Sequence, residues 1–228
     1  MPRAVPAVRR VRAALRAEWR SLRRTAWHEL RTRRLAGVWL ALGAALAMIC
    51  LHELQQIPSS DRVVRLLSEV RADQPLWLSL LRTPLSVLVP TRDQPVWGGL
   101  PRLLLSLALA QLLLGCRRTL LIAYAATLAG TLSARVMVAI GPEHFAGVPA
   151  AYAHDVDTGA SAAVVGLFTY LSVRLRAPVL CLLTVVPTIV GSILKPNLAG
   201  REHLVAVTLV LVLALIQERR RPNEFRTG

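Results

Sequence analysis

Residues 155–166 read DVDTGASAAVVG, an acidic loop that turns into a small-residue apolar helix. One hydroxyl group, that of Ser161, lies just inside the start of this helix. A serine hydroxyl is a weak nucleophile until a base accepts its proton. The best base in the chain is His203, at the head of the last apolar segment. The functional question is therefore whether these two side chains meet.

The composition is that of a membrane protein. Apolar residues make up 54% of the 228 residues, and the mean hydropathy is +0.48, above the average of soluble proteins. The net charge of +15 comes almost wholly from arginine, since Lys195 is the only lysine, which suggests a GC-rich bacterial genome. The charge flanks the apolar segments, and aromatic residues are only 5% of the chain. We therefore expect a topology signal and attraction to anionic lipid, and no nucleic-acid binding.

The chain shows no pattern of ligands that predicts a metal or another cofactor. Cys50, Cys116 and Cys181 stand apart in apolar surroundings, without the spacing of a metal site or a disulfide framework. His154, Asp155 and Asp157 in the acidic loop leave a metal site open as an alternative, although three ligands within four residues rarely converge without a partner elsewhere. Asp157 can also cap the helix that follows or hydrogen-bond the Ser161 hydroxyl.

Three regions divide the chain. Residues 1–34 form a basic cytoplasmic segment, residues 35–217 a membrane domain, and residues 218–228 a basic cytoplasmic tail. Apolar residues recur at steps of three or four in the first region, which fits a helix on the cytoplasmic leaflet, and a disordered arginine-rich tail is the alternative. No cleavable signal peptide is expected, because the basic leader is too long.

Apolar runs of nearly membrane length predict six transmembrane helices. Their expected bounds are Leu35–Leu51, Trp97–Leu114, Thr119–Ile140, Gly159–Val173, Pro178–Leu194 and His203–Ile216. The stretch 59–96 mixes charges, prolines and short apolar patches, and we expect a long, partly membrane-dipping external loop there. With the N-terminus inside, the arginine-rich segments fall in the cytoplasm and the acidic loop 141–157 falls outside. Both termini are then cytoplasmic.

This topology brings Ser161 and His203 to one level of the membrane. The fourth and sixth helices both start at the outer face, so residues 42 positions apart lie at similar depth. Gly159, Ala163 and Gly166 are small residues that allow another helix to approach closely. An imidazole held at hydrogen-bond distance would then accept the serine proton. The non-functional alternative is that the serine packs between helices and the histidine is a solvated residue at the membrane interface.

Residues 35–217 resemble the rhomboid intramembrane serine proteases, and within them the divergent rhomboid-like proteins of actinobacteria. The resemblance implies an all-α, six-helix rhomboid-like bundle in the bacterial inner membrane, with Ser161 as nucleophile and His203 as base. Transmembrane proteins would be its substrates. The residues that carry it are Gln111 to Gly115 with Arg117 and Arg118, Tyr124, the Gly-Ala-Ser block at 159–161 with Gly166, and His203.

Several positions depart from the family pattern. The family usually has a glycine where this chain has Ala162, another where it has Ala206, and a glutamate where it has Gln111. Its second span carries a histidine and an asparagine that donate to the oxyanion, and residues 95–106 contain neither. The Ser161 backbone amide or the Gln111 side chain would have to substitute, and Gly159 and Asp157 are further candidates for the oxyanion site or the shell around it. The alternative is an inactive rhomboid-like pseudoprotease that binds or escorts membrane proteins.

Overall fold

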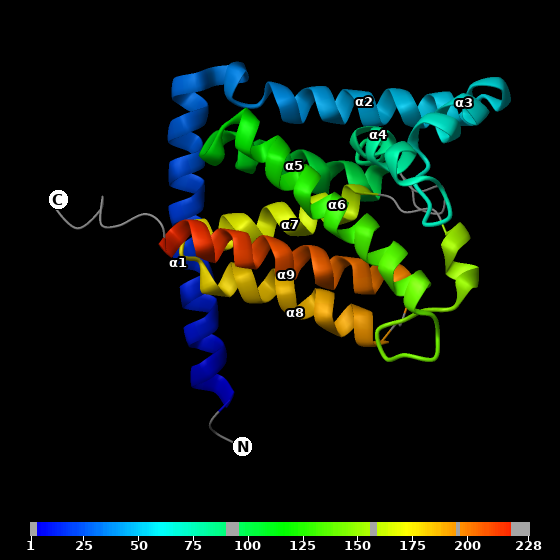
Figure 1. The fold of residues 1–228 in the computed structure, drawn as a ribbon. Coiled ribbons are helices and arrows are strands. Elements are labelled where there is room, and N and C mark those ends of the chain that lie inside the picture. Colours follow the sequence, from blue (N-terminus) through cyan, green and yellow to red (C-terminus); the bar gives the residue numbers. More distant parts are fainter. Residues whose placement is uncertain (1–3, 90–95, 156–158, 195–196, 220–228) are drawn as a thin grey trace.

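The fold is all-helical in the computed structural model, which describes residues 4–89, 96–155, 159–194 and 197–219. Most helices lie side by side and form a bundle, and α1 crosses one end of it (Figure 1). The helices are α1 (Ala4–Arg33), η1 (Arg34–Gly37), α2 (Trp39–Gln56), α3 (Pro58–Ser68), α4 (Leu76–Ser86), α5 (Val96–Leu114), α6 (Cys116–Ile140), η2 (Ala150–His154), α7 (Gly159–Arg174), α8 (Pro178–Leu194) and α9 (Leu198–Arg219).

The helix α1 defines one end of the bundle, which we call the α1 end. The helices α2, α6 and α8 start at this end, and α5, α7 and α9 finish there (Figure 1). The chain bends by 59° between the segment Arg9–Gly37 and α2. The opposite end, which we call the far end, carries α3, α4, η2 and the starts of α7 and α9 (Figure 1).

Several helices are long and apolar enough to cross a membrane. The helices α5, α6 and α9 meet this test by length and composition, and the bent pair of α1 and α2 raises the number from three to four if it is one span. The helices α7 and α8 are apolar but shorter, with 16 and 17 residues. The described residues therefore define a helical membrane protein. The expected count of six crossings goes beyond this finding.

The stretch 59–96 is more regular than expected. Two helices, α3 and α4, occupy most of its described part. Pro58 follows the end of α2 and stands at the first position of α3, where its missing N–H is not needed. Pro84 lies inside α4, where its neighbours Thr83 and Ser86 bond to carbonyls one turn earlier. The expectation of a loop was therefore wrong over α3 and α4.

One carboxylate side chain and one amide side chain cap the starts of two helices at the α1 end. The Glu18 carboxylate of α1 accepts hydrogen bonds from the backbone N–H groups of Val179 at 3.1 Å and Leu180 at 3.0 Å, and so caps α8. The Gln111 Oε1 atom of α5 accepts from the backbone N–H of Leu40 at 3.0 Å, at the start of α2. These bonds satisfy donors that a helix start leaves without an intrahelical partner.

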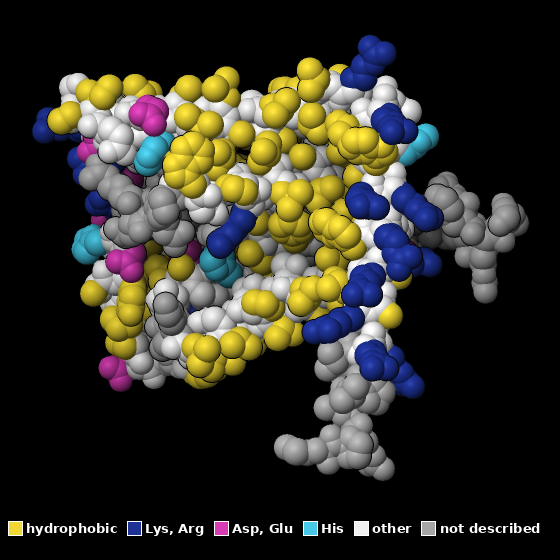
Figure 2. Space-filling model, turned by 180° about the vertical axis from the view of Figure 1, so that it is seen from behind, with side chains coloured by type: hydrophobic (Ala, Val, Ile, Leu, Met, Phe, Trp, Pro, Cys, Tyr) yellow, Lys and Arg dark blue, Asp and Glu magenta, His cyan; other side chains and the backbone are white. Residues whose placement is uncertain are grey.

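One lateral face of the bundle is largely apolar, as a lipid-facing surface requires. Figure 2 shows this face as hollowed, with one Lys or Arg side chain and one His side chain near each other inside the apolar area. Exposed large apolar side chains on α8 include Leu182, Ile193 and Leu194, of which Leu194 is 74% exposed. Exposed apolar surface of this extent marks contact with lipid or with another protein.

Candidate functional site

Ser161 and His203 meet at the far end of the bundle. The distance between Ser161 Oγ and His203 Nε2 is 2.7 Å, a short hydrogen bond. Ser161 is the third residue of α7 and is exposed, and His203 is the sixth residue of α9 and is half-buried. With the imidazole proton on Nδ1, Nε2 accepts the proton of the serine hydroxyl. This is the geometry that a nucleophile and its general base require.

Small residues place α7 against α6 and α9. A Cβ atom at Gly166 would lie 2.5 Å from the Cβ of Ala126 on α6 and 3.4 Å from Val210 of α9. A Cβ atom at Gly159 would lie 2.3 Å from the Cγ2 atom of Thr127. Only glycine allows both approaches without moving a helix. The small residues of α7 therefore set how closely α7 packs on its two neighbours.

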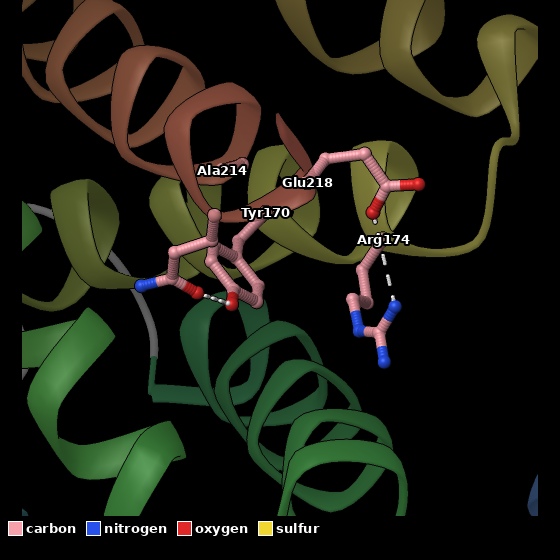
Figure 3. Close-up of a pocket in the computed structure, with 5 residues that line it drawn as sticks. Tyr170, Arg174, Ala214 and Glu218 are labelled. Carbon is pink, nitrogen blue, oxygen red and sulfur yellow. Dashed lines mark hydrogen bonds and ion pairs between the residues drawn. The ribbon is translucent and has the colours of Figure 1, made fainter. Parts of the chain in front are cut away.

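A polar contact ties α7 to α9 near the α1 end as well. The Tyr170 hydroxyl donates a short hydrogen bond to Gln217 Oε1, and one turn further the Arg174 guanidinium lies 3.8 Å from the Glu218 carboxylate. Figure 3 shows these side chains reaching across between the two helices. Together with the Ser161–His203 bond, they hold α7 and α9 in register at two levels.

The helix α4 lies beside the start of α7. The Ser86 hydroxyl and the Val87 side chain would lie 2.9 and 3.3 Å from a Cβ atom at Gly159. Arg135 of α6 holds this region by donating to Ser79 Oγ at 2.5 Å and to the Arg71 carbonyl at 3.1 Å. The Tyr124 hydroxyl of α6 donates to the Leu80 carbonyl at 3.2 Å. The helix α4 therefore forms a rim next to the serine.

The remaining predicted residues lie in different places. Gly159 contacts α6, and its carbonyl accepts a hydrogen bond from the Thr127 hydroxyl at 3.1 Å. Ala163 is fully buried in the main apolar core. Gln111 lies at the α1 end, where its amide oxygen caps α2, so the expectation that it serves the oxyanion is corrected to a structural role. Asp157 lies outside the described residues.

The alternative of a metal site in the acidic loop rests on His154, Asp155 and Asp157, of which Asp157 lies outside the described residues. His154 Nδ1 lies 3.2 Å from Asp73 Oδ2, so this imidazole pairs with the segment between α3 and α4. Within the described ranges, no three His, Cys, Asp or Glu side chains gather in a way that could hold a metal ion.

Sequence reasoning missed one buried acid beside the site. Glu202 precedes His203 in α9 and is only 5% exposed. A Cβ atom at Gly130 of α6 would lie 3.6 Å from its Cβ atom, so Glu202 faces α6. An acid at the head of an apolar segment, directly before the candidate base, is the signal that could have found it.

Fold and site define a class: an all-helical membrane protein with a serine–histidine pair at one end of its bundle. No family model, no curated protein and no solved structure matches this chain.

Proposed function

We propose that the chain is a rhomboid-like intramembrane serine protease that cleaves transmembrane proteins near their outer ends. The observation that carries this proposal is the 2.7 Å contact between Ser161 Oγ and His203 Nε2. Serine and histidine side chains of neighbouring membrane helices form such a bond when close packing brings them into reach. Here the glycines of α7 and the contacts at the α1 end supply that packing.

The reaction follows from the pair. Ser161 Oγ attacks the carbonyl carbon of the peptide bond while His203 Nε2 takes the hydroxyl proton. The tetrahedral intermediate collapses, the C–N bond breaks, and His203 gives the proton to the leaving amine. Water then attacks the acyl-enzyme ester with His203 as base, which releases the new carboxyl group and restores Ser161.

The negative charge on the carbonyl oxygen needs stabilisation at the same place. Ser161 lies in the first turn of α7, and the first turn of a helix directs backbone N–H groups toward its start, where they stabilise an anion. One oxyanion donor is worth about 2.7–4 kcal/mol in the transition state. Because residues 95–106 lack the histidine and asparagine of the family, we expect slow turnover.

In our proposal the bundle crosses the bacterial inner membrane six times, with both termini in the cytoplasm. The helices α7 and α8 have 16 and 17 residues and are about 24 and 26 Å long, slightly less than a hydrocarbon core of about 30 Å. A membrane helix shorter than the hydrocarbon core favours a thinner bilayer around it, so these two helices support local thinning near the site.

The helix α1 then lies along the inner leaflet and binds anionic lipid. It crosses the ends of the other helices (Figure 1). If these helices run along the membrane normal, α1 lies in the plane of the membrane. Leu22 and Ala26 are buried against the bundle, while Trp19 and Trp27 are 46% and 54% exposed beside exposed arginines. This pattern fits an interfacial helix. The salt dependence of binding to nanodiscs, measured with and without anionic lipid, tests this placement of α1.

A serine-reactive fluorophosphonate probe tests the protease. The full chain in mild detergent should be labelled, and Ser161→Ala and His203→Ala should each abolish labelling. Ser133→Ala is a matched control, because Ser133 lies on α6 and its hydroxyl bonds the Gly130 carbonyl of the same helix at 2.7 Å. A folded wild-type protein that the probe does not label would refute the proposed nucleophile.

A second function, the binding or escort of membrane proteins by an inactive relative, is favoured by an apolar groove. The groove has a volume of about 520 Å³ and lies between α2, α4, α5 and α6, with Gly43, Leu107 and Tyr124 among its lining residues. Its size suits the apolar side chains of another membrane helix. A Cβ atom at Gly43 would meet nothing within 4 Å, so Gly43→Trp should fill the groove. This function predicts that Gly43→Trp abolishes binding of client helices.

A further inference from the structure

One charged residue interrupts the apolar sequence of α5. Arg102 is the only charged residue in Val96–Leu114, six residues after the helix begins, and it is exposed. A charge inside a membrane helix is unfavourable without a partner, and charges retained there usually have a function. The place of Arg102 in the bundle therefore needs an explanation.

Arg102 lies at the level of Ser161. The helices α5 and α7 pack against each other, and both run toward the α1 end (Figure 1). Arg102 stands twelve residues before the end of α5, and Ser161 stands thirteen residues before the end of α7. At 1.5 Å per residue, these positions are about 18 and 20 Å from the ends of their helices. Because both helices end at the α1 end, the Cα atoms of Arg102 and Ser161 lie at similar distances from that end.

Arg102 also faces the side on which α7 and α8 lie. It stands nine residues before Gln111, and at 100° per residue this puts it about 180° around the helix. Gln111 bonds to α2, so Arg102 projects from the side of α5 opposite α2. In Figure 1, α7 and α8 lie on that side. Ser161 is itself exposed, two residues after a glycine that contacts α6, so it projects away from α6.

The chain offers Arg102 no counter-ion among its described residues. No described carboxylate pairs with Arg102, and the helices α5, α6, α7 and α8 contain no Asp or Glu. Glu202, the buried acid of α9 near this level, faces α6. An exposed arginine with no partner to orient it is not preorganised as an oxyanion donor. It is better suited to a ligand that brings its own negative charge, with which it can form a bidentate pair.

We propose that Arg102 recognises a carboxylate, an Asp or Glu side chain close to the bond that Ser161 cleaves in a transmembrane substrate. The inference rests on the proposed function for its substrate class, but the recognition step is a binding event and does not need the chemistry. Arg102 is in these terms a specificity residue. It selects acidic segments over otherwise identical neutral ones.

Binding to the full-length Ser161→Ala protein tests this selectivity without cleavage. The probes are two fluorescent transmembrane peptides in neutral-lipid nanodiscs that differ only in one Asp or Asn near the outer end. We expect the protein to bind the Asp peptide at least about tenfold more tightly, as for a carboxylate–guanidinium contact. Arg102→Met should remove the preference, and Arg102→Lys should restore part of it.

Arg118→Met is the matched control, because Arg118 is exposed in the first turn of α6 at the α1 end. It should leave the preference unchanged. The proposal is overturned if the Asp preference is absent, survives Arg102→Met, or is lost equally in Arg118→Met. Equal weakening of both peptides by Arg102→Met also overturns it, and would assign Arg102 to lipid headgroups. Failure of the proposed protease function is distinguishable from this, because fluorophosphonate labelling would then be absent while the preference for the Asp peptide persists.

Discussion

A single methyl group at Gly166 should disturb the Ser161–His203 pair. The Cβ atom of Gly166→Ala would lie 2.5 Å from the Ala126 Cβ atom, whereas carbon atoms in contact lie about 3.5–4.0 Å apart. The helices α6 and α7 must therefore separate by about 1 Å. Overpacking of this kind costs about 1–3 kcal/mol of unfolding free energy. A shift of about 1 Å in a catalytic group reduces the rate by about a hundredfold.

Thermal unfolding in detergent and the rate of fluorophosphonate labelling measure the two effects. Gly43→Ala is the matched control, because the new Cβ atom meets nothing within 4 Å. This substitution should slightly stabilise α2, since alanine has a higher helix propensity than glycine. Ala126→Gly removes the opposing methyl group, so the double variant Gly166→Ala/Ala126→Gly should recover most of the lost stability and labelling. If Gly166→Ala matches the wild type in both assays, the close contact of α6 and α7 does not position the serine.

Three further predictions concern the α1 end and the topology. Glu18→Gln should weaken the cap of α8 and lower the unfolding free energy by about 1 kcal/mol; unchanged chemical denaturation would argue against the cap. Tyr170→Phe should lose the bond to Gln217 at a cost of about 1 kcal/mol, and a thermal melt identical to wild type would show that this contact contributes nothing. A reporter fused after Gly228 should read cytoplasmic, and an external signal would contradict the six-span topology.

The Ser161–His203 contact was predictable because direction and depth follow from the order of apolar segments. Two helices that start at the same face put residues near their starts at one level. Small residues in one of them then indicate close packing. Neither step needs knowledge of the loops between them. The positions of the main apolar helices followed from the same runs of hydrophobic residues.

Other features depend on contacts that local patterns do not encode. In the sequence, Gln111 is a polar residue in an apolar helix. Its hydrogen bond to the backbone N–H of Leu40 depends on the bend before α2, which brings the start of α2 to α5. The helices α3 and α4 were missed because charges and prolines within 59–96 mimic a loop. Packing on α6, through Arg135 and Tyr124, holds α4 as a helix, and α3 packs on α2 and α4.

The contact of Glu18 with the start of α8 constrains the order in which the chain can assemble. Glu18 and Val179 are 161 residues apart, so this carboxylate reaches its partner only after most of the protein has been synthesised. Until then α1 packs on η1 and α5 but lacks its contact with α8. The α1–α8 contact can therefore form only after α8 has been inserted, which makes the joining of these two helices a late event in biogenesis.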